Sequence, residues 1–330
     1  MVIGRKGLTM NKYIGHELQI YGVEEVRLQG GKGDGMRMLN VRNGKGLEIT
    51  ISLDRSADIV RASLKGDNYG YFAPCGYVSP KYYDDKDAGF LKSFTAGFFT
   101  TCGLTAVGSP CTDNGEDLPL HGTISNTPCE TFRHWIEDGK IHIVATIRDA
   151  RIFSYQLILE REYIIPLDEN AVYLTDTIKN IGSMEAPLEV LYHCNMGYPL
   201  LDENAELSIP AVKVEARNDH AQSGIDTCLV CEKPQNGYEE MCYYHTMEGK
   251  TKVSIFNNKI KKALTMSYDT KELPCFTQWK MMGEYDYVMG LEPGNCYPDG
   301  RDVMREKGIL EFLKSGEKKV HHIKFDFTEK

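Results

Sequence analysis

Apolar and polar residues alternate along much of the chain with the two-residue period of a half-buried β-strand. The clearest alternation runs through residues 140–178, where three strand-like segments, 141–147, 155–163 and 171–178, are predicted and a turn at 166–170 precedes the last. Further strands are predicted at 25–28, 36–41, 47–53, 206–209, 252–256, 263–268 and 322–327. Convincing helical periods are absent from the sequence. The pattern predicts an all-β fold, one large antiparallel sandwich over residues 1–330, with residues 1–35 as a partly separate N-terminal strand and loop extension.

Residues 66–120 differ from this pattern, because Gly, Pro, Asn, Asp and Tyr are frequent there and periodicity is weak. Long loops on a β scaffold usually build the mouth of a binding cleft. The segment ends at Leu120-His121-Gly122, and a glycine lets the neighbouring chain approach a ligand closely. His121 is therefore a candidate binding residue.

Two strand-like segments end in residues that can transfer protons. His193 lies at the end of the strand-like segment that begins at Glu189, and Glu292 lies at the end of the segment that begins at Val288, directly before a Pro-Gly turn. Imidazole titrates near neutrality, and a positioned carboxylate can serve as a base. The alternatives are a core histidine bonded to a backbone carbonyl and an exposed loop acid. Trp279, one of two tryptophans, would lie against a sugar ring or fill the core.

Composition narrows the range of partners. The chain has 330 residues, 42% of them hydrophobic, and a net charge of -9. An acidic surface argues against nucleic acid or an anionic membrane as partner, whereas a neutral, hydroxyl-rich ligand is compatible with it. No apolar run approaches the roughly 20 residues that span a bilayer, and residues 1–10 lack the apolar core of a signal peptide. We expect a cytoplasmic protein with no membrane or nucleic-acid partner.

Ten cysteines are scattered singly in strand-like contexts, which favours reduced thiols over a disulfide framework. One grouping, Cys228, Cys231, Cys242 and His245, has the ligand types of a zinc site. However, a strand through 242–245 would direct Cys242 and His245 to opposite faces. Structural zinc therefore stays the less favoured alternative.

Three separated motifs, taken together, suggest a family. They are Leu-His-Gly at 120–122, Tyr-His-Cys-Asn-Met-Gly at 192–197, and Gly-Leu-Glu-Pro followed by Tyr-Pro-Asp within 290–299. Their order resembles that of the aldose 1-epimerases, also called galactose mutarotases, and Gln278-Trp279 is similar to the stretch before that family's catalytic glutamate. The longer sequences at residues 52–59 and 120–128 resemble those of a divergent bacterial branch of the superfamily. The resemblance implies a large antiparallel β-supersandwich, which agrees with the strand pattern.

The resemblance also implies roles for individual residues. His193 matches the general acid that protonates the sugar ring oxygen, and Glu292 matches the general base that deprotonates the anomeric hydroxyl. His121 matches a second histidine that holds the substrate. His245 lies where the family places an acidic substrate-binding residue, and the family's arginine upstream of its first histidine has no counterpart near residues 96–98. Arg55, whose simplest interpretation is a rim ion pair with its flanking acids, is a candidate substitute.

This chemistry needs a monosaccharide or sugar derivative and neither metal nor cofactor, because ring opening requires one proton delivered and one removed. Two other functions remain open. His121, His193 and Glu292 could form a two-histidine, one-carboxylate metal site, although the compact spacing of such sites is missing. The same fold could also serve as a catalytically silent carbohydrate-binding or sensor module.

Overall fold

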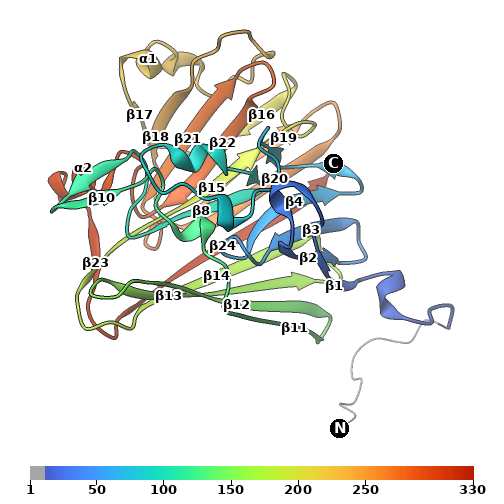
Figure 1. Cartoon of the computed structure of the whole chain (residues 1–330). Coiled ribbons are helices and arrows are strands. Elements are labelled where there is room, and N and C mark those ends of the chain that lie inside the picture. The colour runs from blue at the N-terminus through green and yellow to red at the C-terminus, as the bar shows by residue number, and fades with distance from the viewer. Residues whose placement is uncertain (1–11) are drawn as a thin grey trace.

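The structure is a computed structural model that describes residues 12–330. Residues 1–11, which contain the segment judged not to be a signal peptide, lie outside the described residues. The largest sheet has eight strands. In spatial order they are β11 (Thr131–Glu137), β12 (Lys140–Ala150), β13 (Gln156–Pro166), β14 (Ala171–Asn180), β24 (Lys318–Glu329), β20 (Lys262–Asp269), β19 (Lys250–Asn257) and β16 (Ala205–Ser208). The last strand of the chain thus lies in the middle of this sheet (Figure 1).

A second sheet of seven strands carries the residues of interest. Its order is β17 (Lys213–Ala216), β18 (Met241–Thr246), β21 (Cys275–Met282), β22 (Tyr287–Gly294), β15 (Ala186–Met196) and β23 (Glu311–Leu313), and β8 (Phe99–Leu104) also pairs with β15. Every residue of β15 is buried, because the strand is paired on both edges and covered on both faces.

A third sheet of five strands lies beside these two in Figure 1 and near the N-terminus in sequence. It contains β1 (Gly22–Arg27), β2 (Arg37–Arg42), β3 (Leu47–Ser52), β4 (Asp58–Leu64) and β5 (Asp67–Asn68). Residues of all three sheets belong to one buried apolar cluster. The predicted antiparallel β-sandwich is confirmed, and each segment predicted as a strand lies within or overlaps a strand.

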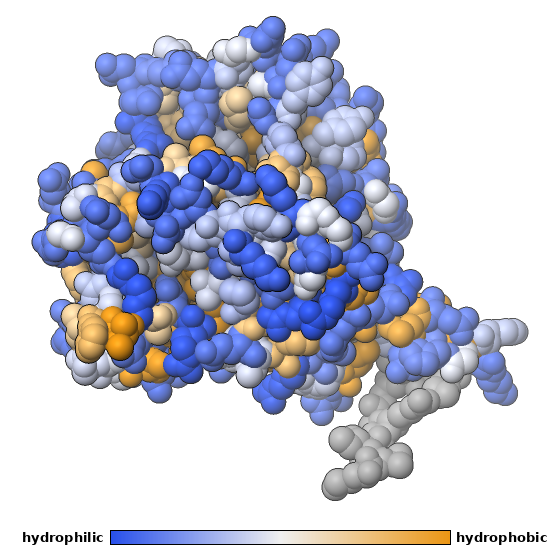
Figure 2. Space-filling model, in the orientation of Figure 1, coloured by the Kyte–Doolittle hydropathy of each residue, from blue (hydrophilic) through white to orange (hydrophobic). Residues whose placement is uncertain are grey.

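Short elements fill the connections. They are β6 (Tyr71–Phe72), β7 (Ala96–Gly97), β9 (Cys111–Asp113), β10 (Glu116–Leu118), α1 (Asp219–Gln222), α2 (Arg301–Glu306) and the 3-10 turns η1 (Glu17–Gln19), η2 (Gly31–Gly33), η3 (Pro80–Tyr82), η4 (Gly89–Lys92), η5 (Ile124–Asn126) and η6 (Ile225–Thr227). The face in Figure 2 is mostly hydrophilic, with apolar residues in small separate groups. Within residues 12–330 no helix has the length and apolar character needed to cross a membrane.

A buried ionic cluster joins the three sheets and includes Tyr192 of β15. The Arg161 guanidinium of β13 donates to the carboxylates of Asp58 on β4 and Asp176 on β14. It also donates to the Thr101 hydroxyl of β8, and the Tyr192 hydroxyl of β15 donates to Asp176 at 2.8 Å. Because paired and hydrogen-bonded charges are the form in which ions are tolerated in a core, this cluster fixes the position of β15.

Candidate active site

His193 and Glu292 face each other from neighbouring strands. Cys194 of β15 is opposite Leu291 of β22, so the preceding and following residues, His193 and Glu292, share one face of the sheet. His193 Nδ1 lies 3.3 Å from Glu292 Oε1, and the two residues are only 5% and 1% exposed. Neither atom has a hydrogen-bond partner among the described residues, because the contact between them is not aligned as a hydrogen bond. The two polar atoms, in contact but not hydrogen-bonded, keep their capacity to bond to a group placed beside them.

The glycine two residues before Glu292 makes room for its carboxylate. A Cβ atom built on Gly290 would lie 2.2 Å from Glu292 Oε1 and 2.8 Å from Trp279 Cβ. No side chain fits at this distance, so the Gly-Leu-Glu sequence is what lets the carboxylate fold back over the sheet. The motif at 192–197 on β15 and the Gly-Leu-Glu motif at 290–292 on β22 lie side by side because the two strands are paired.

His121 approaches the same place from a loop. Its φ is 59°, a conformation that is uncommon for a residue with a side chain, and its backbone N–H donates to the Gly108 carbonyl at 2.9 Å. Gly122 follows because a Cβ there would lie 2.5 Å from the carbonyl oxygens of Gly103 and Ala106. The His121 and His193 ring centres are 5.5 Å apart, with the rings nearly perpendicular at 85°.

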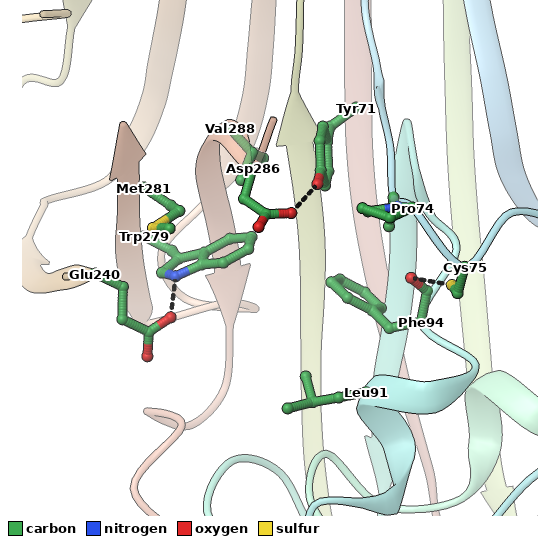
Figure 3. A pocket seen from close by; sticks show the side chains of 11 residues that line it. Tyr71, Pro74, Cys75, Leu91, Phe94, Glu240, Trp279, Met281, Asp286 and Val288 are labelled. Atoms are coloured by element: carbon green, nitrogen blue, oxygen red, sulfur yellow. Dashed lines mark hydrogen bonds between the residues drawn. The ribbon is translucent and has the colours of Figure 1, made fainter. Parts of the chain in front are cut away.

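Aromatic rings surround His193. The ring centres of Phe94 and Trp279 each lie 5.2 Å from that of His193, in edge-to-face contacts. Trp279 Nε1 donates to Glu240 Oε2 at 2.6 Å. Both rings also line a cavity of about 340 Å³, so the His193–Glu292 pair adjoins an open space with flat apolar walls (Figure 3).

Burial sets the protonation state of the pair. Desolvation lowers the pKa of His193 to about 4 and raises the pKa of Glu292 well above its usual range, with the Glu240 carboxylate adding to the rise. Desolvation also lowers the pKa of His121, and the neighbouring His193 adds to that effect. Since burial penalises either charged form alone, the His193–Glu292 pair holds a single proton over a wide range of pH. A pair with one proton can donate that proton to one atom of a ligand and accept a proton from another atom.

Arg217 supplies the cation at this site, and sequence reasoning missed it. It directly follows β17, and its Nη2 donates to Ser109 Oγ at 2.8 Å and to the Pro298 carbonyl at 3.1 Å. Its Nε lies 3.4 Å from Asp299 Oδ1, and its charge lowers the pKa of both Glu292 and His121. The sequence offers one indication of a cation here, because Asp299, the acid that Arg217 contacts, belongs to the Tyr-Pro-Asp motif.

The structure does not bring His245 to the pair. Residues on β18 alternate between the two faces of the sheet, and Cys242 is opposite Trp279, so Cys242 and Tyr244 lie on the face that carries Glu292. His245 faces the core, where its Nε2 lies 2.9 Å from Gln278 Oε1, while Gln278 Nε2 donates to the Cys228 carbonyl at 2.7 Å. A residue on that face has no path to a ligand at Glu292.

No described contact joins Arg55 to His193 or Glu292, and its place as a substrate-binding residue stays a prediction. It is buried, donates from Nη1 to the Val78 carbonyl at 3.2 Å, and its pKa is lowered to about 10 by burial. The interpretation as a rim ion pair is wrong, because Asp54 pairs with Arg37 and Asp58 with Arg161. Arg55 therefore contacts the 75–83 loop close to Cys75, which lines the cavity beside Trp279, and its buried Nη2 has no hydrogen-bond partner among the described residues.

The proposed zinc ligands do not converge either. Cys242 and His245 point to opposite faces of β18, as the strand pattern predicts. All ten cysteines are free thiols. In the described part of the chain, no group of three or more His, Cys, Asp or Glu side chains is arranged to hold a metal ion.

Solved structures with the same architecture identify the class of protein. A protein from Klebsiella pneumoniae subsp. pneumoniae MGH 78578, provisionally named an aldose 1-epimerase, aligns with TM-score 0.90 and 25% identity over 95% of this chain and 86% of that one. A galactose mutarotase-like protein from Clostridium acetobutylicum aligns with TM-score 0.72 and 13% identity over 94% and 100%. Galactose 1-epimerase from Lactobacillus acidophilus NCFM aligns with TM-score 0.64 and 14% identity over 94% and 99%. The chain is a galactose mutarotase-like β-sandwich protein.

The sequence also matches a family directly. Residues 33–327 match the family described as "Domain of unknown function (DUF4432)", and the chain belongs to this family. A search of curated proteins gave no match.

Proposed function

We propose that the protein is an aldose 1-epimerase-like isomerase that interconverts the α and β anomers of a sugar in the cytoplasm, without metal or cofactor. One observation carries the proposal. His193 Nδ1 and Glu292 Oε1 lie 3.3 Å apart, buried and unpartnered in the described structure, at the edge of an aromatic-lined cavity. The two oxygens that exchange protons in a cyclic hemiacetal are bonded to the same carbon, so an acid and a base this close together match the substrate.

The reaction follows from the shared proton. Burial keeps the shared proton on Glu292 in the free site, so the reaction begins when that proton passes from Glu292 to His193, whose Nδ1 is 3.3 Å away. The Glu292 carboxylate then takes the proton of the C1 hydroxyl while protonated His193 gives its proton to the ring oxygen. The C1–O5 bond breaks and the C1 carbonyl forms, which gives the open-chain aldehyde. Rotation about the C1–C2 bond presents the other face of the carbonyl to the C5 hydroxyl. Reclosure returns the hydroxyl proton to His193 and the Glu292 proton to O1, so no proton or electron is gained or lost.

The neighbouring residues support these transfers. The imidazole of His121, neutral because burial lowers its pKa, offers one donor and one acceptor to the sugar oxygens near C1. Arg217 stabilises the carboxylate form of Glu292 through its charge, which is the form that accepts the hydroxyl proton. The indole of Trp279 provides a flat face for the sugar ring.

Saturation-exchange NMR on a panel of reducing sugars tests this function. We expect the purified protein to accelerate anomer exchange of at least one sugar, with the same rate in the presence of a chelator. Exchange that disappears with chelator and returns with added metal would instead support the metal site of His121, His193 and Glu292. Sugar binding without any exchange would support a sensor module.

A further inference from the structure

A second buried acid lies on the strand that carries His193 and takes no part in the proton transfers described above. Glu189 is the fourth residue of β15 and is 0% exposed. The two-residue alternation of a strand places its side chain on the same face as that of His193, about 13 Å along the strand. Its Oε1 has no hydrogen-bond partner among the described residues. Burial of a partly bonded carboxyl group costs free energy, so the stability of the fold does not account for this side chain.

The other oxygen of Glu189 holds the main chain of a loop that contacts His121. Glu189 Oε2 accepts a hydrogen bond from the Val107 N–H at 2.9 Å, and Val107 is itself buried. The next residue, Gly108, accepts the His121 N–H with its carbonyl oxygen at 2.9 Å. Two hydrogen bonds and the segment Val107–Gly108 therefore join the Glu189 carboxyl group to the backbone of His121.

The opposite side of this loop is packed against the Tyr-Pro-Asp motif. A Cβ atom built on Gly108 would lie 2.1 Å from the Pro298 carbonyl carbon, and the Ser109 N–H donates to the Pro298 carbonyl at 3.3 Å. Residues 105–109 thus lie between Pro298 and β15. Because Pro298 leaves no room for the loop to move toward it, the reach of the Glu189 side chain sets the position of the loop from the other side.

His121 depends on its backbone for the position of its ring. Its φ of 59° is uncommon for a residue with a side chain, and its buried Nδ1 has no hydrogen-bond partner in the described part of the chain. Its N–H bonds to Gly108, and its carbonyl accepts the Gly103 N–H at 3.1 Å. A shift of the Val107–Gly108 segment therefore moves the imidazole relative to His193, whose ring centre is 5.5 Å away.

We propose that Glu189 is a positioning residue for anomer exchange, which holds the His121 imidazole at the sugar through the Val107 N–H and the Gly108 carbonyl. The role rests on the proposed function, in which His121 contacts the sugar oxygens near C1. It adds a residue that touches neither the substrate nor the His193–Glu292 pair.

Two substitutions of Glu189 test its hydrogen bond. Burial raises the pKa of Glu189 to about 8, against the lowering effects of the Val107 N–H and the Arg301 cation, so the acid is neutral at pH 7 and glutamine matches it. Glu189→Gln keeps an acceptor for Val107 and should leave kcat/KM within about threefold of the parent. Glu189→Met has a similar length but no acceptor. It should lower kcat/KM at least about tenfold, because a displacement of about 1 Å at the reacting groups costs up to about 10²-fold.

A double variant tests whether the loss passes through His121. In the His121→Ala background, Glu189→Met should change kcat/KM by less than about twofold, since the side chain that it positions is absent. Asn43→Leu is the matched control, because Asn43 is 1% exposed and its Oδ1 accepts the Leu47 N–H at 3.1 Å in the five-stranded sheet. Asn43→Leu should lower Tm, as Glu189→Met does, and leave kcat/KM unchanged.

Hydrogen exchange gives a measurement that needs no activity. Peptides that span residues 105–122 should exchange faster in Glu189→Met, and at the parent rate in both Glu189→Gln and Asn43→Leu, because only the first variant releases this loop. If no sugar undergoes anomer exchange, the proposed function fails, and hydrogen exchange alone decides whether Glu189 holds the segment at His121.

Three results would overturn the proposal. They are parent-like kcat/KM in folded Glu189→Met, equal losses in Glu189→Gln and Glu189→Met, and a loss that persists in the His121→Ala background. Should Glu189→Met not fold, Glu189→Asp decides, since it keeps the acid but withdraws the acceptor by one methylene. Glu189→Asp should then show both the lower kcat/KM and the faster exchange of residues 105–122, and parent values for either would overturn the proposal.

Discussion

The Gly290→Ala substitution isolates the placement of the Glu292 carboxylate. The new Cβ atom would lie 2.2 Å from Glu292 Oε1, well inside the closest approach of two such atoms. Trp279 Cβ, at 2.8 Å, blocks the other direction. The strand cannot retreat freely because Gly290 is paired with Trp279 on one side and Asn195 on the other. The flexible Glu292 side chain must therefore swing away from His193.

The size of the effect follows from the required movement. Restoring ordinary contact moves the carboxylate by about 1 Å or more, and a displacement of about 1 Å at a reacting group costs about 10²-fold in rate. We therefore expect kcat to fall about a hundredfold, which corresponds to about 2.7 kcal/mol. Crowding of the core should cost about 1–3 kcal/mol of stability.

Anomer exchange by NMR measures the rate, and thermal unfolding measures the stability. Gly15→Ala is the control, because the nearest atom to its Cβ is 3.8 Å away. The effect should also vanish in the Glu292→Gln background, since both changes disable the same group. A folded Gly290→Ala protein with kcat within about threefold of the parent would refute the reasoning.

Other predictions follow from the same structure. Because burial lowers the pKa of His193 to about 4 and raises that of Glu292, kcat/KM should be flat through neutrality and fall as pH drops through about 4, where His193 gains a proton while Glu292 keeps its own and no base remains. Arg217→Gln removes a cation that lowers the pKa of Glu292, so the alkaline limb of the pH–rate profile should move to higher pH; an unmoved limb would show that Arg217 does not act on Glu292. Arg161→Met leaves Asp58 and Asp176 buried without their cation and should cost about 3–5 kcal/mol in urea unfolding. The control is Arg148→Met, which removes the exposed ion pair of Arg148 with Glu130 and should cost at most about 1 kcal/mol of stability. Equal losses of stability in the two variants would contradict the role of the buried cluster. Since all ten cysteines are free, reducing agent should leave Tm nearly unchanged and elemental analysis should find no stoichiometric zinc; one zinc per chain would contradict the account of Cys242 and His245.

The sequence predicts the strands because half-buried strands leave a two-residue pattern, as in β12, where Ile141, Ile143, Ala145 and Ile147 are buried in turn. That signal is absent from β15, since all its residues are buried and their order does not distinguish the faces. His193 and Glu292 are found through short motifs, but their contact depends on the pairing of Cys194 with Leu291, which no local pattern specifies.

His245 and Arg217 show the complementary limit. The strand pattern places Cys242 and His245 on opposite faces of β18 but does not show which face carries the site. The family resemblance points to His245, which lies on the core face. Arg217 contacts Asp299, and its charge acts on Glu292, from a segment outside every motif. A residue whose position is set only by long-range packing leaves no signal in its own neighbourhood.

The central claim is that His193 and Glu292 together transfer the two protons of anomer exchange, and their conservative variants test it most directly. The matched control is the exposed pair His322 and Glu272, whose Nδ1 and Oε1 lie 3.0 Å apart. Glu292→Gln and His193→Asn should each lower kcat for anomer exchange by at least about a hundredfold, because proton transfer by a positioned group contributes about 10²–10⁴-fold, with sugar affinity largely kept. Glu272→Gln and His322→Asn should leave kcat unchanged. Ordinary turnover by folded Glu292→Gln would contradict the account, since glutamine cannot accept the hydroxyl proton.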